Sequence, residues 1–357
     1  MLEFAGIGPA PFCAMLLADM GAEVLRIDRV GEAPGPGQTV LGRGKAALGL
    51  DLKTDMAREL CLELAGVADV LIEGFRPGVM ERLGLGPDPT RARNPRLIYG
   101  RMTGWGQDGP LASAVGHDLG YIAVAGALDP LGEAGRPPPP PLNLLGDFGG
   151  GALYLAFGIA AALVERERSG EGQVIDAAIV DGTAHLMTLF HGLAAAGVTD
   201  MTRGQGLLAG SAPFYRAYEC ADGLWLSVAA LEPRFYAALL HGTGASGEAL
   251  AVQYDRSRWP EATQALAAVF LTRTRAEWCE QLEGADACVA PVMGFDEAPG
   301  HPHLQARGVF ETHGGLLQPA PAPRFSRTPG AVATSAPAGE ADGWTMAQRW
   351  TGAGPPR

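Results

Sequence analysis

Residues 1–28 read MLEFAGIGPAPFCAMLLADMGAEVLRID, and they set the expectation for the whole fold. Met1–Ala5 is apolar enough for a short strand, Pro9–Met20 has apolar residues at helical spacing, and Ala22–Asp28 is a second apolar run. A helix that connects two buried strands is the unit from which parallel sheets are built. The sequence therefore predicts an α/β fold.

The alternation of strand and helix continues over the first hundred residues. Further strands are expected at Ala46–Leu52, Asp69–Ile72 and Arg96–Met102. Parallel sheets bind ligands beyond the carboxyl ends of their strands, and Arg29, Lys53 and Arg76 each follow a predicted strand. The only lysines of the chain, Lys45 and Lys53, both lie in this arginine-rich part. The first third of the chain therefore predicts an anion site at one edge of a sheet.

A different pattern begins after Gly197. Two β-type runs, Phe214–Cys220 and Leu224–Ala229, flank an Asp-Gly turn and predict a hairpin, which helices follow. The expected organisation is a large α/β domain over residues 1–196, a linker over 197–213, a small α+β domain over 214–308 and a C-terminal segment over 309–357. From Pro319 onward the chain is rich in Pro, Ala and Gly, which predicts an extended tail lying over another surface.

Composition argues against several classes of function. The net charge of −12 disfavours nucleic acid as a partner, although local charge can oppose the total. The five cysteines include no C-x-x-C pair, which predicts reduced thiols, no metal site and a cytoplasmic protein. Glycine and charge interrupt the apolar runs, so no segment is expected to be long enough to span a membrane.

The loop Gly6-Ile7-Gly8-Pro9-Ala10-Pro11 is similar to a dinucleotide-binding fingerprint, and Asp28 lies roughly where a ribose-binding acid would be. Pro11 replaces the third glycine, and both prolines lack the N–H groups that a pyrophosphate requires. A nicotinamide cofactor is therefore not expected.

Two glycine-flanked motifs carry ionisable residues at expected helix starts. Gly116-His117-Asp118-Leu119-Gly120-Tyr121 places an imidazole ahead of an apolar run, and Asn143-Leu144-Leu145-Gly146-Asp147-Phe148-Gly149-Gly150-Gly151 places a carboxylate ahead of a longer one. A helix start offers free N–H groups and a positive dipole end, and glycines let a ligand approach the backbone closely. Each motif could hold a proton carrier beside donors for negative charge, although such residues are more often caps or structural.

These motifs resemble those of the family III CoA-transferase superfamily and, within it, of the α-methylacyl-CoA racemases. The resemblance runs over nearly the whole chain. It rests on ordered segments that include Leu71-Ile72-Glu73-Gly74-Phe75-Arg76-Pro77-Gly78, Arg101-Met102-Thr103-Gly104-Trp105-Gly106, Gly116-His117-Asp118, Gly146-Asp147-Phe148-Gly149-Gly150 and Glu232-Pro233. The Gly-His-Asp setting of His117 favours the racemase branch.

The resemblance implies a Rossmann-like large α/β domain made from both chain ends, a small α+β domain between them, and an interlocked homodimer. It implies an epimerase that interconverts (R)- and (S)-2-methylacyl-CoA thioesters through an enolate. His117 and Asp147 are the implied acid–bases, and Glu232 of the second chain is implied to orient His117. CoA is part of the substrate, and neither another cofactor nor a metal is implied. The implied CoA contacts are Arg29, Leu50, Asp51, Leu52, Lys53, Gly74, Phe75, Arg76, Pro77, Gly78, Arg82, Gly116, Asp118, Leu119, Gly120 and Tyr121.

The chemistry of the implied reaction leaves alternatives open. A backbone N–H near Asp118 is the candidate donor to the enolate oxygen. A helix start should lower the pKa of Asp147, whereas a base for so weak a carbon acid should be less acidic, and desolvation by the acyl chain could reverse the effect. The sequence does not determine the acyl specificity. Two other functions fit: a CoA transferase in which Asp147 attacks the acyl-CoA, and an acyl-CoA-binding protein without catalysis.

Overall fold

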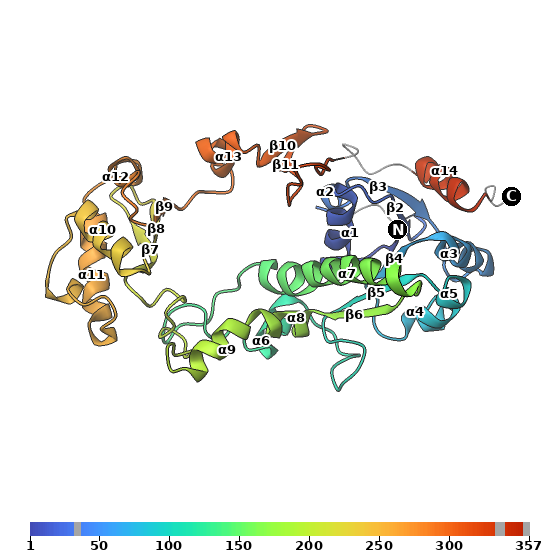
Figure 1. Ribbon diagram of the computed structural model, residues 1–357, viewed down its shortest axis with the longest axis horizontal. Coiled ribbons are helices and arrows are strands. Elements are labelled where there is room, and N and C mark those ends of the chain that lie inside the picture. The colour runs from blue at the N-terminus through green and yellow to red at the C-terminus, as the bar shows by residue number, and fades with distance from the viewer. Residues whose placement is uncertain (32–36, 333–339, 353–357) are drawn as a thin grey trace. The chain divides into compact units, whose positions relative to one another are not determined.

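The computed structural model describes residues 1–31, 37–332 and 340–352, and Figure 1 labels its elements. The chain forms two compact units, each assembled from separate stretches of sequence. The larger unit comprises Met1–Ala125, Pro141–Leu186 and the described residues of Pro302–Arg357, and the smaller unit comprises Gly126–Pro140 and Met187–His301. Residues 197–213, which were expected to form a linker, belong to the smaller unit.

A six-stranded parallel sheet forms the centre of the larger unit. Its strands are β1 (Leu2–Phe4), β2 (Val24–Asp28), β3 (Lys45–Gly49), β4 (Val70–Glu73), β5 (Ile98–Thr103) and β6 (Val174–Ala178). Their order is β3-β2-β1-β4-β5-β6, and every neighbouring pair is parallel. The strand order reverses between β1 and β4, so the loops after these strands border a crevice. The expected Rossmann-like α/β fold is confirmed.

Helices cover both faces of this sheet (Figure 1). The helices of the larger unit are α1 (Pro9–Asp19), α2 (Gln38–Leu41), α3 (Asp55–Val67), α4 (Val79–Arg82), α5 (Pro87–Arg93), α6 (Asp118–Val124), η1 (Leu144–Ala152), α7 (Leu153–Ser169), α8 (Ile179–Leu186), α13 (Pro302–Ala306) and α14 (Glu340–Thr351). On one face α1 and α7 pack with Ile72 and Ile98, and on the other α3 and α14 pack with Leu71. Successive strand residues point to opposite faces, so Leu71 and Ile72 lie in different cores.

The longest helix of the larger unit joins η1, a π-helix, to α7 without interruption, giving 26 residues over Leu144–Ser169. By length and composition it could cross a membrane, so the expectation that no segment is long enough was wrong, because the glycines do not break the helix. This is weak evidence for a membrane span, since the core helix of a soluble protein passes the same test. Leu155, Ile159 and Ala162 of α7 are buried in the core against the sheet.

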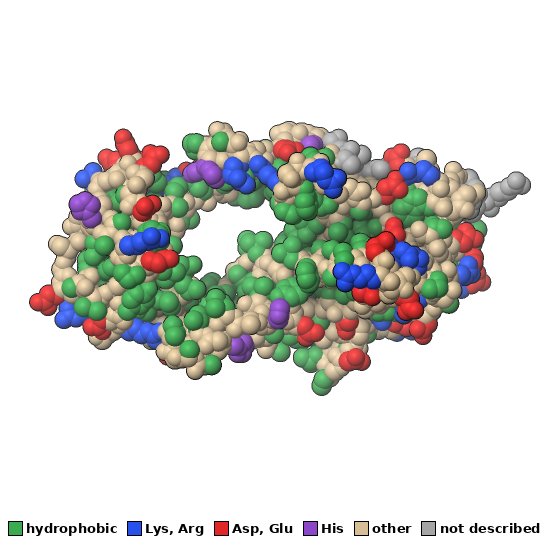
Figure 2. Space-filling model, in the orientation of Figure 1, with side chains coloured by type: hydrophobic (Ala, Val, Ile, Leu, Met, Phe, Trp, Pro, Cys, Tyr) green, Lys and Arg blue, Asp and Glu red, His purple; other side chains and the backbone are tan. Residues whose placement is uncertain are grey.

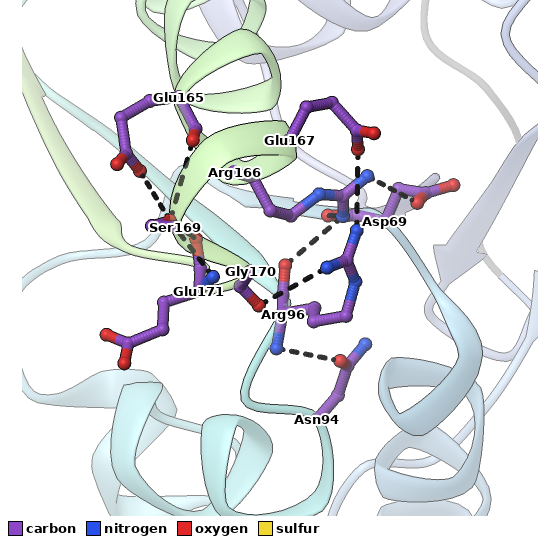
Figure 3. Close-up of polar contacts among 9 residues, drawn as sticks. All are labelled: Asp69, Asn94, Arg96, Glu165, Arg166, Glu167, Ser169, Gly170 and Glu171. Atoms are coloured by element: carbon purple, nitrogen blue, oxygen red, sulfur yellow. Dashed lines mark hydrogen bonds and ion pairs between the residues drawn. The ribbon is translucent and has the colours of Figure 1, made fainter.

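Arg166 fixes the carboxyl-terminal end of α7 (Figure 3). Its guanidinium is buried and donates to the Asp69 carboxylate at 2.8 Å and to the Arg96 carbonyl at 3.2 Å. Gly170 then ends the helix with φ +79°, and its carbonyl accepts from the Arg96 side chain at 3.3 Å. Asp69 and Arg96 lie just before β4 and β5. The end of α7 is therefore attached to the amino-terminal edge of the sheet.

The C-terminal part of the larger unit contains a hairpin and a helix. β10 (Phe310–His313) pairs antiparallel with β11 (Leu316–Pro319). Helix α14 packs so closely on β3 that Gly343 leaves no space for a Cβ against the Ala47 carbonyl group. The extended tail expected from Pro319 onward is therefore interrupted by a helix, which the burial of Ala347 against the sheet stabilises.

The smaller unit contains an antiparallel sheet and helices around its own core. Its elements are α9 (Thr188–Ala195), β7 (Tyr215–Glu219), β8 (Trp225–Ala229), α10 (Pro233–Thr243), η2 (Glu248–Leu250), η3 (Arg256–Arg258), α11 (Trp259–Phe270), α12 (Arg275–Leu282), β9 (Val289–Pro291) and η4 (Ala298–Gly300). The predicted hairpin is confirmed as β7 and β8, and the Cys220 N–H donates to the Leu224 carbonyl at 2.8 Å across its turn. Phe270 and Trp278 are buried in the core, where the indole donates to the Phe270 carbonyl at 2.8 Å.

Candidate active site

A cavity of about 510 Å³ lies at the carboxyl edge of the sheet in the larger unit. Its walls come from the loops after β1, β4 and β5 and from α6, η1 and α8. The lining residues are 7–10, 74–77, 102–105, Ala112, 114–117, Tyr121, Asn143, Asp147 and Ile179. A parallel sheet of this order binds its ligands at such a crevice.

His117 lines the cavity from the start of α6. It is the N-cap residue of that helix, with extended backbone angles of φ −137° and ψ 170°, and its side chain is exposed. Within the described part of the chain, its ring makes no capping hydrogen bond to the helix. The imidazole is therefore accessible from the cavity and does not serve as a cap.

Asp147 lines the same cavity from η1. The N-cap of η1 is Asn143, so Asp147 lies inside the first turn and not at the capping position that a lone Asp before a helix usually takes. The Asn143 amide nitrogen is 3.4 Å from Asp147 Oδ2, and a Cβ on Gly8 would lie 3.2 Å from the same oxygen. The half-buried carboxylate is thus held between the loop after β1 and the start of η1.

The surroundings raise the pKa of Asp147 above its usual value of 3.8. Burial is the largest cause and the Asp118 charge acts in the same direction, whereas the Asn143 hydrogen bond and the His117 charge lower the pKa. A helix start was predicted to lower the pKa of Asp147, but removal of the carboxylate from water has the larger effect and raises it. A less acidic carboxyl group is a better acceptor for a proton from carbon.

The glycines that follow Asp147 serve packing within the protein. A Cβ on Gly150 would lie 2.7 Å from the Thr183 backbone nitrogen, and Gly182 of α8 has no space for a Cβ against the Gly150 carbonyl group. This close approach of η1 and α8 explains the glycine run differently from the predicted close approach of a ligand.

Tyr121 of α6 forms an aromatic wall of the cavity. Its ring meets Trp105 edge-on, with 4.8 Å between ring centroids. Gly104 and Gly116 make room for the ring, and a Cβ on Gly116 would lie 2.6 Å from it. Sequence analysis missed Trp105 and Asn143 as lining residues, although the Gly-Trp-Gly segment and the polar residue that opens the second motif were available signals.

The residues that the resemblance assigned to CoA fall into two groups. Those that line the cavity are Gly74, Phe75, Arg76, Pro77, Gly116 and Tyr121. Those outside its lining are Arg29, Leu50, Asp51, Leu52, Lys53, Gly78, Arg82, Asp118, Leu119 and Gly120. The basic side chains of both groups are exposed, whereas Leu50 is buried in the core.

Several other basic residues of the first third have acidic partners inside the protein. Lys45 Nζ lies 2.8 Å from Glu3 Oε2 and donates to the Pro11 carbonyl at 2.9 Å, and both charged side chains are buried. Further ion pairs are Arg26–Asp28, Arg43–Asp19 and Arg58–Asp55. Lys45 is therefore not part of an accessible anion site, and Lys53 is the exposed lysine.

A buried ion pair lies beneath the loop over residues 74–77. Glu73, the last residue of β4, accepts the Phe75 N–H at 2.7 Å and the Arg101 Nε–H at 3.1 Å. Arg101 also lies 2.8 Å from the Glu81 carboxylate of α4. The Arg101 guanidinium thus connects Glu73, which precedes the loop over residues 74–77, to Glu81, which follows it.

Glu232, the third expected catalytic residue, lies in the smaller unit. It is the N-cap residue of α10, with φ −73° and ψ 143°, and its side chain is exposed. His117 and Asp147 both belong to the larger unit.

Comparison with known proteins covers almost the whole chain. Residues 1–342 match the family model of CoA-transferase family III. The α-methylacyl-CoA racemases of Mus musculus and Homo sapiens are 48% and 45% identical over 330 residues, which are 92% of this chain and 86% of each relative. A crystal structure of a CaiB/BaiF family protein from Brucella suis matches with a TM-score of 0.84 and 25% identity, over 98% of this chain and 97% of that chain. This chain therefore belongs to CoA-transferase family III.

Proposed function

We propose that this protein interconverts (R)- and (S)-2-methylacyl-CoA thioesters by moving the proton on the carbon next to the thioester. The observation that best supports this function is that His117 and Asp147, from two separate elements, line one cavity. The similarity to two α-methylacyl-CoA racemases supports the same reaction.

Racemisation requires an acid–base group on each side of one carbon atom. In one direction the His117 imidazole removes the proton and the Asp147 carboxyl group returns one to the opposite face, and in the other direction their roles are exchanged. The negative charge that develops on the thioester oxygen requires a fixed donor. The backbone N–H of Asp118, at the first position of α6, is the proposed donor. The raised pKa of Asp147 supports its role as a base.

The same edge of the sheet is proposed to bind the CoA part of the substrate. Arg29, Lys53 and Arg76 are exposed and follow β2, β3 and β4, at the carboxyl ends where anions bind in parallel sheets. CoA enters with the substrate, and we propose that the reaction uses no other cofactor and no metal. The free thiols of the five cysteines support a cytoplasmic location. The net charge of −12 supports the proposal that nucleic acid is not a partner, and we propose no membrane partner either.

A second copy of the chain is proposed to complete the site in an interlocked homodimer. Leu153, Phe157 and Val164 of α7 are more than half exposed, and hydrophobic side chains are visible over this part of the larger unit in Figure 2. Their spacing places them on one side of the helix, and an exposed apolar face is typical of an interface. In this dimer Glu232 of one copy would orient His117 of the other.

Exchange of the α-proton in heavy water tests the reaction. When no second acid is present, we expect both enantiomers of a 2-methylacyl-CoA to exchange the α-proton and to invert. Proton NMR measures both processes. His117→Ala should lower the rate of inversion by about 100-fold or more and leave CoA affinity nearly unchanged. His241→Ala, at an exposed position of α10, is the matched control and should keep full activity.

The alternatives give different outcomes in the same assay. Transfer of CoA to a second acid without α-proton exchange would identify a CoA transferase with Asp147 as nucleophile. Binding of the thioester with neither exchange nor transfer would identify a binding protein. A fully active His117→Ala variant would remove the imidazole from the mechanism.

A further inference from the structure

Asp118 follows His117 in sequence, but its carboxylate contacts the backbone of Asp147. Asp118 Oδ1 accepts the Asp147 N–H at 2.5 Å, between residues that are 29 positions apart. Asp118 is only 8% exposed. Its other oxygen, Oδ2, is buried and has no hydrogen-bond partner among the described residues. The carboxylate is therefore directed toward the start of η1 and not toward solvent.

The π-helical geometry of η1 creates the need for this contact. The first backbone hydrogen bond of η1 runs from the Phe148 N–H to the Asn143 carbonyl at 3.2 Å. The Asp147 N–H lies one residue earlier, so the helix itself offers it no acceptor. A half-buried N–H without a partner is costly, and the carboxylate of Asp118 supplies one.

Gly146 makes room for the contact. A Cβ at position 146 would lie 2.9 Å from Asp118 Cγ and 2.8 Å from Ile122 Cγ2. Neither neighbour can retreat easily, because both belong to α6 and are buried. Gly146 and Asp118 therefore form one packing contact, and this contact joins the two motifs.

We propose that Asp118 is a positioning residue whose buried carboxylate holds the Asp147 backbone and thereby orients the Asp147 side chain toward the reacting carbon. The proposal rests on the proposed function, in which Asp147 is an acid–base group. The Asp118 charge also raises the pKa of Asp147, whereas the His117 charge lowers it. Burial and the nearby Asp147 charge both raise the pKa of Tyr121. Asp118 thus acts on both the position and the acidity of Asp147.

Two substitutions separate these effects. Asp118→Ala removes both the acceptor and the charge, and we expect kcat to fall by about 10-fold to 100-fold while the KM for acyl-CoA stays within about twofold. Asp118→Asn keeps an oxygen acceptor without the charge, and we expect most of kcat to remain and the acidic limb of the pH–rate profile to move to lower pH. Gly146→Ala should act like Asp118→Ala, and Asp88→Asn, at an exposed position of α5, should change neither quantity.

A carbon NMR titration of labelled aspartates tests the contact without substrate. The Asp147 signal is assigned by its loss in Asp147→Asn, and in Asp118→Asn it should titrate at lower pH than in the wild-type protein. An unchanged titration in Asp118→Asn, together with full kcat in Asp118→Ala or Gly146→Ala, would overturn the proposal. A raised KM at unchanged kcat would also overturn it and assign Asp118 to CoA binding. Absence of exchange in the wild-type protein would refute the proposed function alone, because the titration still measures the effect of Asp118 on Asp147 without turnover.

Discussion

The Arg101 Nε–H donates to the Glu73 carboxylate at 3.1 Å beneath the wall of the cavity. Glu73 is 1% exposed, and its second oxygen accepts the Phe75 N–H, so the ion pair also holds the backbone of the loop over residues 74–77. Four residues of this loop line the cavity. The shape of the proposed CoA site therefore depends on a buried carboxyl group and a guanidinium that do not line the cavity.

Stability should depend on pH through Glu73. Burial raises the pKa of Glu73 from its usual value of 4.5 to about 7, so the folded protein holds a proton that the unfolded chain releases between these values. The stabilising contribution of this proton is complete below pH 4.5 and is lost as the pH rises through about 7. Glu73→Gln removes the titration, and its stability relative to the wild-type protein should rise by about 2 kcal/mol between about pH 5 and pH 8.

Urea unfolding at the two pH values measures this change. Glu81→Gln is the matched control, because Glu81 contacts the same arginine from an exposed position and should give a much smaller pH-dependent difference. If the difference in unfolding free energy between Glu73→Gln and the wild-type protein does not change with pH, Glu73 does not titrate in this range.

The two lysines should respond differently to substitution by methionine. Lys45→Met leaves Glu3 as an unpaired buried charge and should lower the free energy of unfolding by about 3 to 5 kcal/mol. Lys53→Met should change stability by less than about 0.5 kcal/mol but weaken CoA binding by about fivefold, since Lys53 is exposed at the proposed CoA site. Urea unfolding and calorimetric titration with CoA measure the two effects. The double variant with Glu3→Gln should recover much of the stability lost in Lys45→Met.

Gly182→Ala should disrupt the contact between α8 and η1. Its Cβ has no space against the Gly150 carbonyl group, so we expect a loss of about 3 kcal/mol or failure to fold. Gly66→Ala in α3 is the matched control, because a Cβ there meets no atom within 4 Å and should stabilise the helix by about 0.5 to 1 kcal/mol. Thermal unfolding distinguishes the two variants. Equal stability of both would mean that α8 and η1 can separate freely.

Arg166→Ala should destabilise the attachment of α7 to the sheet. It removes hydrogen bonds to the Asp69 carboxylate and to the Arg96 carbonyl from a buried site, and we expect a loss of about 3 kcal/mol. Arg168→Ala removes an exposed side chain from the same turn and should cost less than about 0.5 kcal/mol. A similar small effect of both substitutions in urea unfolding would contradict the anchoring role of Arg166.

The sequence predicted most of the fold because buried parallel strands have a strong local signature. Runs such as Val70–Glu73 and Ile98–Thr103 are apolar and flanked by helical patterns, and their hydrogen-bonded neighbours follow from the rules of α/β folds. The meeting of His117 and Asp147 at one cavity was also expected, from the resemblance. The catalytic roles of His117, Asp147 and Glu232 stay predictions.

The parts that could not be predicted depend on pairings across the fold. Lys45 was counted toward the predicted anion site, but β1 and β3 both flank β2 and bring Glu3 to it. The role of Gly150 depends on a neighbour in α8, and no local pattern distinguishes a π-helix from an α-helix. Asp118 was assigned to CoA by the resemblance, and its contact with the Asp147 backbone appears only when α6 and η1 are placed together.

The continuous helix from η1 through α7 makes Asp147 dependent on the opposite rim of the sheet, where Arg166 is fixed. Deleting one residue between these two positions would turn the carboxylate by about 100° around the helix axis and retract it by about 1.5 Å. The length of the helix between the two residues therefore determines where the Asp147 carboxylate lies. Natural or designed changes of acyl preference are expected at exposed residues of the cavity lining such as Ile7 and Val115. The number of residues between Asp147 and Arg166 is expected to stay unchanged.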